Sequence, residues 1–255
     1  MEELIKNYCH FFSGRCVKKL GLQSWLVSDK SHRCYVVKIA VTENETAFLT
    51  NQARWQRHRP DLTGASFIEF RRFEHYSALL SHYIPGPTLS ELIRGQWHPS
   101  TKGPPDLILM ADTVYRLQQE VHKLHKSHVI HGDLKPQNVV CECQAVTLLD
   151  FANARKQHSD DTHRQFYSYS CSFSLPQQQQ GVGSADIEKD QYGFFCMLHI
   201  AMNGHLPRID WRSNSPLNGI FDQSIKQYLN HLSESDLMNE VWQLNEDLVC
   251  YSEKA

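Results

Sequence analysis

Residues 131–138 read His-Gly-Asp-Leu-Lys-Pro-Gln-Asn, and residues 148–152 read Leu-Leu-Asp-Phe-Ala. Together they supply four side chains suited to phosphoryl transfer from a nucleotide: Asp133, Lys135, Asn138 and Asp150. That reaction needs a group to orient the attacking hydroxyl, a cation along the migrating phosphate, and oxygen ligands for magnesium. The gap between the two stretches suits a hairpin of two short strands, which would return Asp150 to the loop.

The two stretches resemble the catalytic loop and metal-binding segment of eukaryotic-type protein kinases, where H-R-D-x-x-x-x-N is followed by D-F-G. The resemblance implies that Asp133 accepts the proton of a substrate hydroxyl and that Lys135 contacts the transferred phosphate. It implies that Asn138 and Asp150 bind magnesium and that His131 is structural. A lysine at position 135 is similar to the serine/threonine-directed branch of the family.

The first part of the chain is rich in strand-forming residues separated by turn residues. We expect strands at 17–20, 25–28, 34–39, 66–71 and 77–83, with one helix at 43–57. This order resembles the small lobe of a protein kinase. The prediction is therefore a two-lobed α+β fold, with a mainly β small lobe at residues 1–82 and a shortened, mainly α large lobe at residues 83–255.

A hinge is expected at about residues 82–88, around the break Ile84-Pro85-Gly86-Pro87. Thr88 and Glu91 then fit a capping box, which predicts the start of a helix. By resemblance, the adenine of ATP would lie against residues 80–86, with Ser81 at the gatekeeper position and Tyr83 among the nucleotide-binding residues.

Lys38, in Tyr-Val-Val-Lys-Ile, resembles the strand lysine that contacts the α- and β-phosphates of ATP in kinases. Its expected partner is a glutamate on the following helix. Glu45 is the first choice, because Phe48 and Leu49 can pack inward nearby, and Glu43 is the alternative.

Three positions depart from the kinase pattern. Gly21 alone represents the usual glycine-rich loop, so phosphates should be held less tightly or differently, although we still expect Gly21 near the nucleotide. Ala152 replaces a glycine, at a cost on the order of 1 kcal/mol if positive φ is required. Gly132 replaces an arginine that pairs with an activation-loop phosphate in many kinases, which predicts activity without that phosphorylation.

The large lobe should contain helices at 106–126 and 189–202 and an activation segment closing at Leu175-Pro176-Gln177. Asp190 resembles the aspartate that supports the catalytic-loop backbone. Helical periodicity also occurs at 225–232 and 237–248. The histidines spaced three residues apart are interpreted as structural rather than metal ligands: His122, His125, His128 and His131.

Composition agrees with an ordinary globular chain. Its 255 residues are 41% hydrophobic with a formal net charge of -2, which gives no indication of nucleic-acid binding. The chain has no apolar run long enough to span a membrane and no N-terminal secretory pattern. The eight irregularly spaced cysteines favour reduced thiols over a disulfide framework, and Cys141-Glu142-Cys143 lacks the further ligands of a zinc site. We therefore expect a cytoplasmic protein.

These features predict an ATP-dependent protein kinase that phosphorylates serine or threonine in a protein substrate with Mg²⁺, or Mn²⁺ in its place. Two alternatives stay open. A small-molecule kinase of the aminoglycoside or lipopolysaccharide-sugar type often carries His-Gly-Asp, although Lys135-Pro136 argues against it. A pseudokinase that serves as a binding module would explain the lost glycines.

Overall fold

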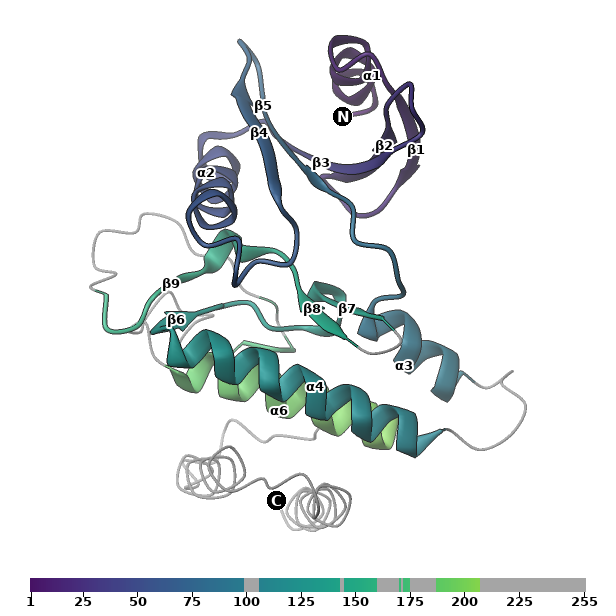
Figure 1. Cartoon of the computed structure of the whole chain (residues 1–255), viewed down its shortest axis with the longest axis vertical. Helices are drawn as coiled ribbons and strands as arrows, with labels where there is room; N and C mark the ends of the chain where they lie inside the picture. The colour runs from purple at the N-terminus through teal and green to yellow at the C-terminus, as the bar shows by residue number, and fades with distance from the viewer. Residues whose placement is uncertain (99–105, 143–144, 160–169, 171, 175–186, 207–255) are drawn as a thin grey trace. The chain divides into compact units, whose positions relative to one another are not determined.

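The computed structural model of the chain describes residues 1–98, 106–142, 145–159, 170, 172–174 and 187–206. The chain forms two compact units (Figure 1). The first comprises Met1–Pro85 and Leu149–Ala154, and the second comprises Gly86–Leu148 and the residues from Arg155 on. The first unit therefore ends three residues after the expected lobe boundary at 82, and it also contains the Asp150 segment.

The first unit is built on a five-stranded antiparallel sheet of order β1-β2-β3-β5-β4. Its strands are β1 (Arg15–Lys19), β2 (Ser24–Ser28), β3 (Cys34–Ala40), β4 (Phe67–Arg72) and β5 (Ser77–His82). All five were predicted, with bounds within two residues of those observed. Strand β3 places Lys38 opposite Ser24 on one side and Leu79 on the other.

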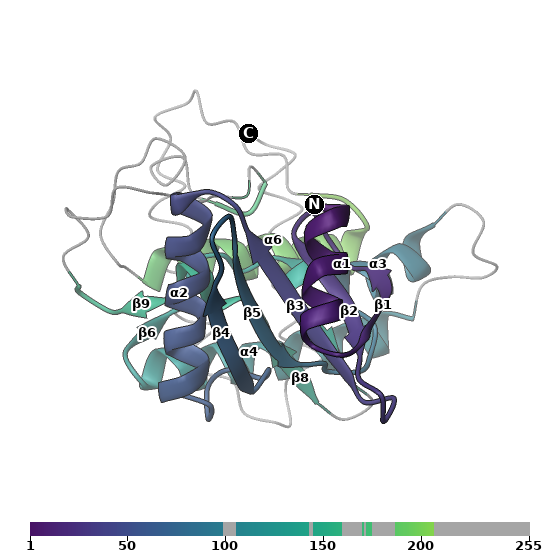
Figure 2. The same cartoon turned by 90° about the horizontal axis from the view of Figure 1, so that it is seen from above.

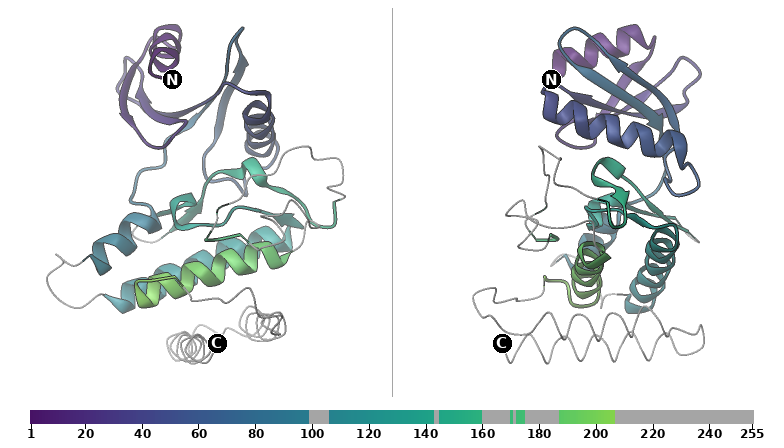
Figure 3. Two further views of the ribbon diagram at one scale, coloured as in Figure 1. Left: turned by 180° about the vertical axis from the view of Figure 1, so that it is seen from behind. Right: turned by 90° about the vertical axis from the view of Figure 1, so that its left-hand side faces the viewer.

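Two helices cover opposite faces of this sheet (Figures 2 and 3). Helix α1 (Glu2–Phe11) packs in one apolar cluster with residues such as Val37, whereas α2 (Glu43–His58) packs in another with Ala40. Because successive strand residues point to opposite faces, Lys38 shares the α2 face with Ala40. Helix α2 was predicted, but α1 was not, since only one helix was expected in this part of the chain.

The second unit is mainly helical. Its described helices are α3 (Leu89–Trp97), α4 (Leu107–Lys126) and α6 (Ile187–Asn203). The predicted capping box is confirmed at the start of α3, where the Thr88 hydroxyl and the Glu91 carboxylate each accept the other residue's backbone N–H. Helices α4 and α6 pack side by side (Figures 1 and 3).

Two short antiparallel strand pairs flank the loop that carries the candidate catalytic residues. Strand β6 (Val129–Ile130) pairs with β9 (Arg155–Lys156), and β7 (Val139–Cys141) pairs with β8 (Val146–Leu148). All four strands are antiparallel to their partners. The predicted hairpin between Asn138 and Asp150 is therefore formed.

Several predictions fall outside the described residues: the segment closing at Leu175-Pro176-Gln177, the helical stretches at 225–232 and 237–248, and Cys143. In the described part of the chain, no helix combines the length and apolar character required to cross a bilayer. The cysteines described there carry free thiols: Cys9, Cys16, Cys34, Cys141 and Cys196.

Candidate active site

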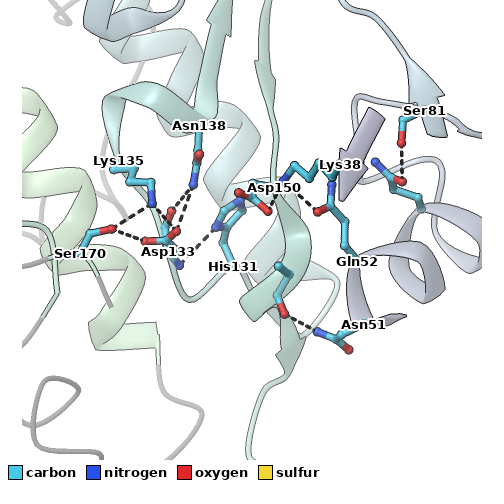
Figure 4. Close-up of polar contacts among 12 residues, drawn as sticks. Lys38, Asn51, Gln52, Ser81, His131, Asp133, Lys135, Asn138, Asp150 and Ser170 are labelled. Atoms are coloured by element: carbon cyan, nitrogen blue, oxygen red, sulfur yellow. Dashed lines mark hydrogen bonds and ion pairs between the residues drawn. The ribbon is translucent and has the colours of Figure 1, made fainter. Parts of the chain in front are cut away.

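The loop between β6 and β7, in the second unit, gathers three of the predicted residues around one carboxylate (Figure 4). The Lys135 ammonium lies 2.6 Å from Asp133 Oδ2. The short 3-10 helix η1 (Pro136–Asn138) turns Asn138 back, so that its Nδ2 donates to the Asp133 backbone oxygen at 2.9 Å and to Oδ2 at 3.3 Å. Asp133 is 6% exposed, so these partners compensate for its burial.

Ser170 is a fourth member of this cluster. Its hydroxyl donates to Asp133 Oδ1 at 2.8 Å and accepts from Lys135 Nζ at 2.9 Å (Figure 4). Ser170 was not among the site residues predicted from the sequence. The contact with Asp133 joins residues 37 positions apart, and no local pattern signals it. In this structure the Asp133 carboxylate therefore accepts a hydrogen bond from an aliphatic alcohol.

A buried aspartate holds the start of the loop. The Asp190 carboxylate, fully buried in α6, accepts from the backbone N–H of His131 at 2.7 Å and of Gly132 at 2.8 Å. His125 Nε2, on α4, lies 3.0 Å from the same carboxylate. Burial alone would raise the pKa of Asp190, but His125, His131 and the Gly132 N–H together hold it below its ordinary value. This is the support that the resemblance predicted for Asp190.

Two glycines permit this arrangement. Gly132 has a φ of 78°, a conformation that costs a residue with a side chain about 1 kcal/mol or more. A Cβ at Gly193, on α6, would lie 2.6 Å from the Leu134 backbone oxygen. The missing Cβ therefore lets the helix approach the loop backbone closely.

The remaining predicted residues lie in the first unit, where Lys38 is the centre of a second cluster (Figure 4). Its ammonium lies 2.7 Å from Asp150 Oδ1 and 2.9 Å from Gln52 Oε1. Gln52 is buried on α2, at 4% exposure. A strand lysine, a helix amide and the Asp150 carboxylate are thus fixed together.

The expected pairing of Lys38 with Glu45 is not formed, and the α2 partner of Lys38 is Gln52. Glu45 instead closes a capping box at the start of α2, where its carboxylate accepts from the backbone N–H of Val41 at 2.9 Å and of Thr42 at 3.0 Å. The Gln23 side chain also donates to it. The alternative, Glu43, sits in the same exposed first turn, whereas Gln52 lies two turns further along on the sheet-facing side.

The backbone strain lies at Asp150, not at Ala152. Asp150 adopts the left-handed conformation, with φ 65° and ψ 64°, whereas Ala152 lies in the 3-10 helix η2 (Phe151–Asn153) without positive φ. The cost considered for the alanine therefore does not arise. The strained residue is the predicted metal ligand, and a left-handed non-glycine residue costs roughly 1 kcal/mol or more.

The predicted nucleotide-binding residues Ser81, Tyr83 and Gly21 have local partners in the first unit. Ser81 is buried and donates to Gln56 Oε1 at 2.9 Å (Figure 4). The Tyr83 N–H donates to the Cys34 backbone oxygen at 3.4 Å, and the Gly21 N–H to the Ser24 backbone oxygen at 3.1 Å. Their roles toward a nucleotide remain predictions.

The chemistry of the available donors fits a hard divalent cation. Asp150 in the first unit and the side-chain oxygen of Asn138 in the second are each oxygen donors of the kind that Mg²⁺ prefers. The Asn138 NH₂ group already donates to Asp133, which leaves the amide oxygen as the atom suited to a cation. Among the described residues, no group of three or more His, Cys, Asp or Glu side chains is placed to hold a metal ion.

Comparison with known proteins decides the family. The family model described as "Protein kinase domain" matches residues 65–254. The chain belongs to the protein kinase family. The match includes the loop at 131–138, Asp150 and Asp190, whereas the part of this kinase domain that carries Lys38 and Gln52 precedes it. The sheet-rich first unit and helix-rich second unit agree with the predicted two-lobed α+β fold.

Curated relatives of this kinase domain carry the same family name. Over 134 residues, or 51% of the chain, it is 26% identical to the serine/threonine-protein kinase PknB of Mycobacterium leprae, covering 20% of that protein. It is 25% identical over 131 residues to a probable serine/threonine-protein kinase of Clostridium acetobutylicum, covering 19% of it. A shorter match, 45% identical over 47 residues, joins it to the probable serine/threonine-protein kinase mps1 of Dictyostelium discoideum, covering 5% of that protein. The chain thus spans about a fifth or less of these relatives.

Proposed function

We propose that this kinase domain transfers the γ-phosphate of ATP to serine or threonine hydroxyls of a protein substrate. The observation that carries the proposal is the Asp133 carboxylate, which accepts a serine hydroxyl at 2.8 Å while Lys135 Nζ lies 2.6 Å away. A catalytic aspartate must hold a substrate hydroxyl in this way, and the adjacent ammonium is suited to a transferring phosphate.

In this proposal the first unit is the small lobe and the second is the large lobe, and each contributes residues to the use of ATP. Lys38 would bind the phosphates, and Ser81, Tyr83 and Gly21 would line the base and phosphate sites. Asn138 and Asp150 would hold Mg²⁺, or Mn²⁺, which when bound neutralises charge on the phosphates. Asp133 would orient the acceptor hydroxyl and take its proton, while Lys135 would stabilise the negative charge that develops nearby.

We further propose that activity does not require phosphorylation of the activation segment. Gly132 has no cation with which to bind such a phosphate. The loop backbone that an ordered activation segment would support is already held by Asp190, through two N–H donors. The Asp150 segment is likewise held by residues of its own unit.

Radiolabel transfer tests the function directly. Purified protein should transfer γ-³²P from ATP to a mixture of protein acceptors in the presence of Mg²⁺, with label recovered as phosphoserine or phosphothreonine. Asp133→Ala should lower the rate of phosphate transfer by about 1,000-fold or more, because the variant lacks the general base. The variant should still fold. Asp150→Ala should abolish the response to Mg²⁺.

The same assay separates the alternatives. Label found on an aminoglycoside or sugar acceptor, but not on protein, would replace the proposed function by small-molecule phosphorylation. Nucleotide binding without turnover, equal in the wild type and Asp133→Ala, would indicate a binding module. A domain that transferred phosphate only after treatment with an activating kinase would contradict the phosphorylation-independent activity.

A further inference from the structure

Helix α2 holds the backbone that follows Asp150 through two side chains. Asn51 Nδ2 donates to the backbone oxygens of Ala152 and Ala154, both at 2.9 Å. Figure 4 draws one of these two bonds. The Trp55 indole Nε1–H donates to the Ala154 oxygen, also at 2.9 Å. The Ala154 oxygen therefore accepts two hydrogen bonds, and the chain from 152 to 154 is fixed against the helix.

The same helix holds the Asp150 side chain indirectly. Gln52 fixes the Lys38 ammonium, which pairs with Asp150 Oδ1. Trp55 lies four residues after Asn51 and three after Gln52, so each of these two side chains neighbours it across one turn of α2. One helix surface thus restrains both the carboxylate and the backbone just after it.

These restraints explain why Asp150 retains its left-handed backbone. An isolated aspartate would relax from φ 65° to a more favourable region, and such strain persists only where the surroundings determine it. Trp55 is 6% exposed and Ala154 is fully buried, so water cannot readily replace the indole donor. The direction of the Asp150 carboxylate therefore depends on the hydrogen bonds that the backbone oxygens of Ala152 and Ala154 accept.

We propose that Asn51 and Trp55 are positioning residues that set the geometry of Asp150 for a divalent cation. This inference rests on the proposed function, since it assigns the role of a metal ligand to Asp150. Groups that orient a metal ligand without touching the metal commonly change metal affinity about 10- to 100-fold when removed. Neither residue carries a charge, so they act on the cation only through Asp150.

Two substitutions remove the donors with little change in size. Trp55→Phe keeps an aromatic ring and deletes the indole N–H, and Asn51→Leu keeps the branched shape and deletes the amide. Trp97→Phe is the matched control, because the Trp97 Nε1–H donates to the Ala201 backbone oxygen at 3.0 Å in the second unit. Thr50→Val, an exposed change on α2, controls for general effects on the helix.

The Mg²⁺ concentration for half-maximal ATP turnover is the first readout. It should rise about 10-fold or more in the Asn51→Leu/Trp55→Phe double variant and less than about twofold in both controls. At saturating Mg²⁺ the turnover number should largely recover, which a merely destabilised protein would not show. The second readout needs no nucleotide: amide hydrogen exchange of residues 151–155 should accelerate about 10-fold in the double variant while α2 stays protected.

The outcomes separate the two proposals. A wild type with turnover and a double variant with an unchanged Mg²⁺ requirement would overturn the positioning role alone. A wild type that binds no nucleotide in the presence of Mg²⁺ would overturn the proposed function and, with it, the metal role. If the double variant does not fold, the Trp55→Phe single variant tests the inference. A Mg²⁺ requirement of Trp55→Phe equal to that of Trp97→Phe would overturn it.

Discussion

The Lys38 ammonium donates to the Gln52 side-chain oxygen at 2.9 Å, in the place where a glutamate was expected. An amide can orient an ammonium as well as a carboxylate can, but it leaves the positive charge undiminished. Asp150, 2.7 Å from the same ammonium, then supplies the ionic partner. Two side chains therefore fix the direction of the Lys38 ammonium, which in the proposed function would contact a phosphate group.

Removing the amide should weaken nucleotide use. Gln52→Leu deletes the hydrogen bond to a charged group, worth about 1.5 kcal/mol or more, so kcat/KM for ATP should fall about 10-fold or more. Gln52→Glu replaces the acceptor with an anion and should stay within about threefold of the wild type. Steady-state kinetics with varied ATP measures both. Thr50→Val on the same helix should leave kcat/KM unchanged, and a fully active Gln52→Leu would mean that Asp150 alone aligns Lys38.

Ser170 should matter through its hydroxyl rather than through phosphorylation. Ser170→Ala deletes hydrogen bonds to Asp133 and Lys135, which should lower kcat about 10- to 100-fold with little change in KM for ATP. Ser170→Thr keeps the hydroxyl and should retain most of the activity. Ser170→Asp should be inactive, because a second carboxylate beside Asp133 is repulsive.

The surrounding hydroxyls provide the comparison. Thr162→Ala, Ser168→Ala and Ser172→Ala should each leave turnover unchanged if the activation segment needs no phosphate. Rescue of Ser170→Ala by the aspartate variant, or loss of turnover in the triple alanine variant, would contradict this account. Mass spectrometry of the purified wild type would show whether any of these positions carries phosphate.

Sequence reasoning succeeded where the determining contacts are local. The sheet strands, helix α4 and the capping box at Thr88 follow from patterns within a few residues. The cluster of Asp133, Lys135 and Asn138 follows in the same way, because one short loop carries all three.

Prediction from the sequence failed where two local patterns competed for one residue, or where the contacting residues are far apart in the sequence. Thr42 and Glu45 form the same T-x-x-E pattern as Thr88 and Glu91, so the capping rule could have excluded Glu45 as the partner of Lys38. Ser170 has no such signal, since 35 residues separate it from Lys135. Helix α1 was not predicted, although the residues that it buries, Ile5, Tyr8 and Cys9, have helical spacing.

The close approach of α6 to the catalytic loop should make Gly193 intolerant of a side chain. In Gly193→Ala the new Cβ would meet the Leu134 oxygen at 2.6 Å, so either the helix or the loop must shift, at a cost of about 1–3 kcal/mol. The turnover number should fall as well, because Leu134 lies next to Asp133.

Gly95→Ala in α3 is the control, because nothing lies within 4 Å of its Cβ. It should raise the free energy of unfolding by about 0.5–1 kcal/mol. Chemical denaturation measures the free energy of unfolding of each variant, and steady-state kinetics measures its turnover number. Equal effects at the two positions would contradict the proposed clash.

Asp190 should link the stability of the catalytic loop to acid pH. Its folded-state pKa is below the ordinary value near 3.9, so its contribution is complete above that pH and is lost as the pH falls through the folded value. Asp190→Asn should lower the free energy of unfolding by about 3 kcal/mol near neutral pH, because it removes a charged acceptor from two N–H donors. The difference between wild type and variant, measured by urea denaturation, should shrink as the pH falls below about 3.9 toward the folded-state pKa. Asp112→Asn, which breaks a surface pair with Arg116, should cost less than about 1 kcal/mol throughout. A wild-type advantage that stayed constant down to the lowest pH would mean that the Asp190 carboxylate is not the ionised support of the loop.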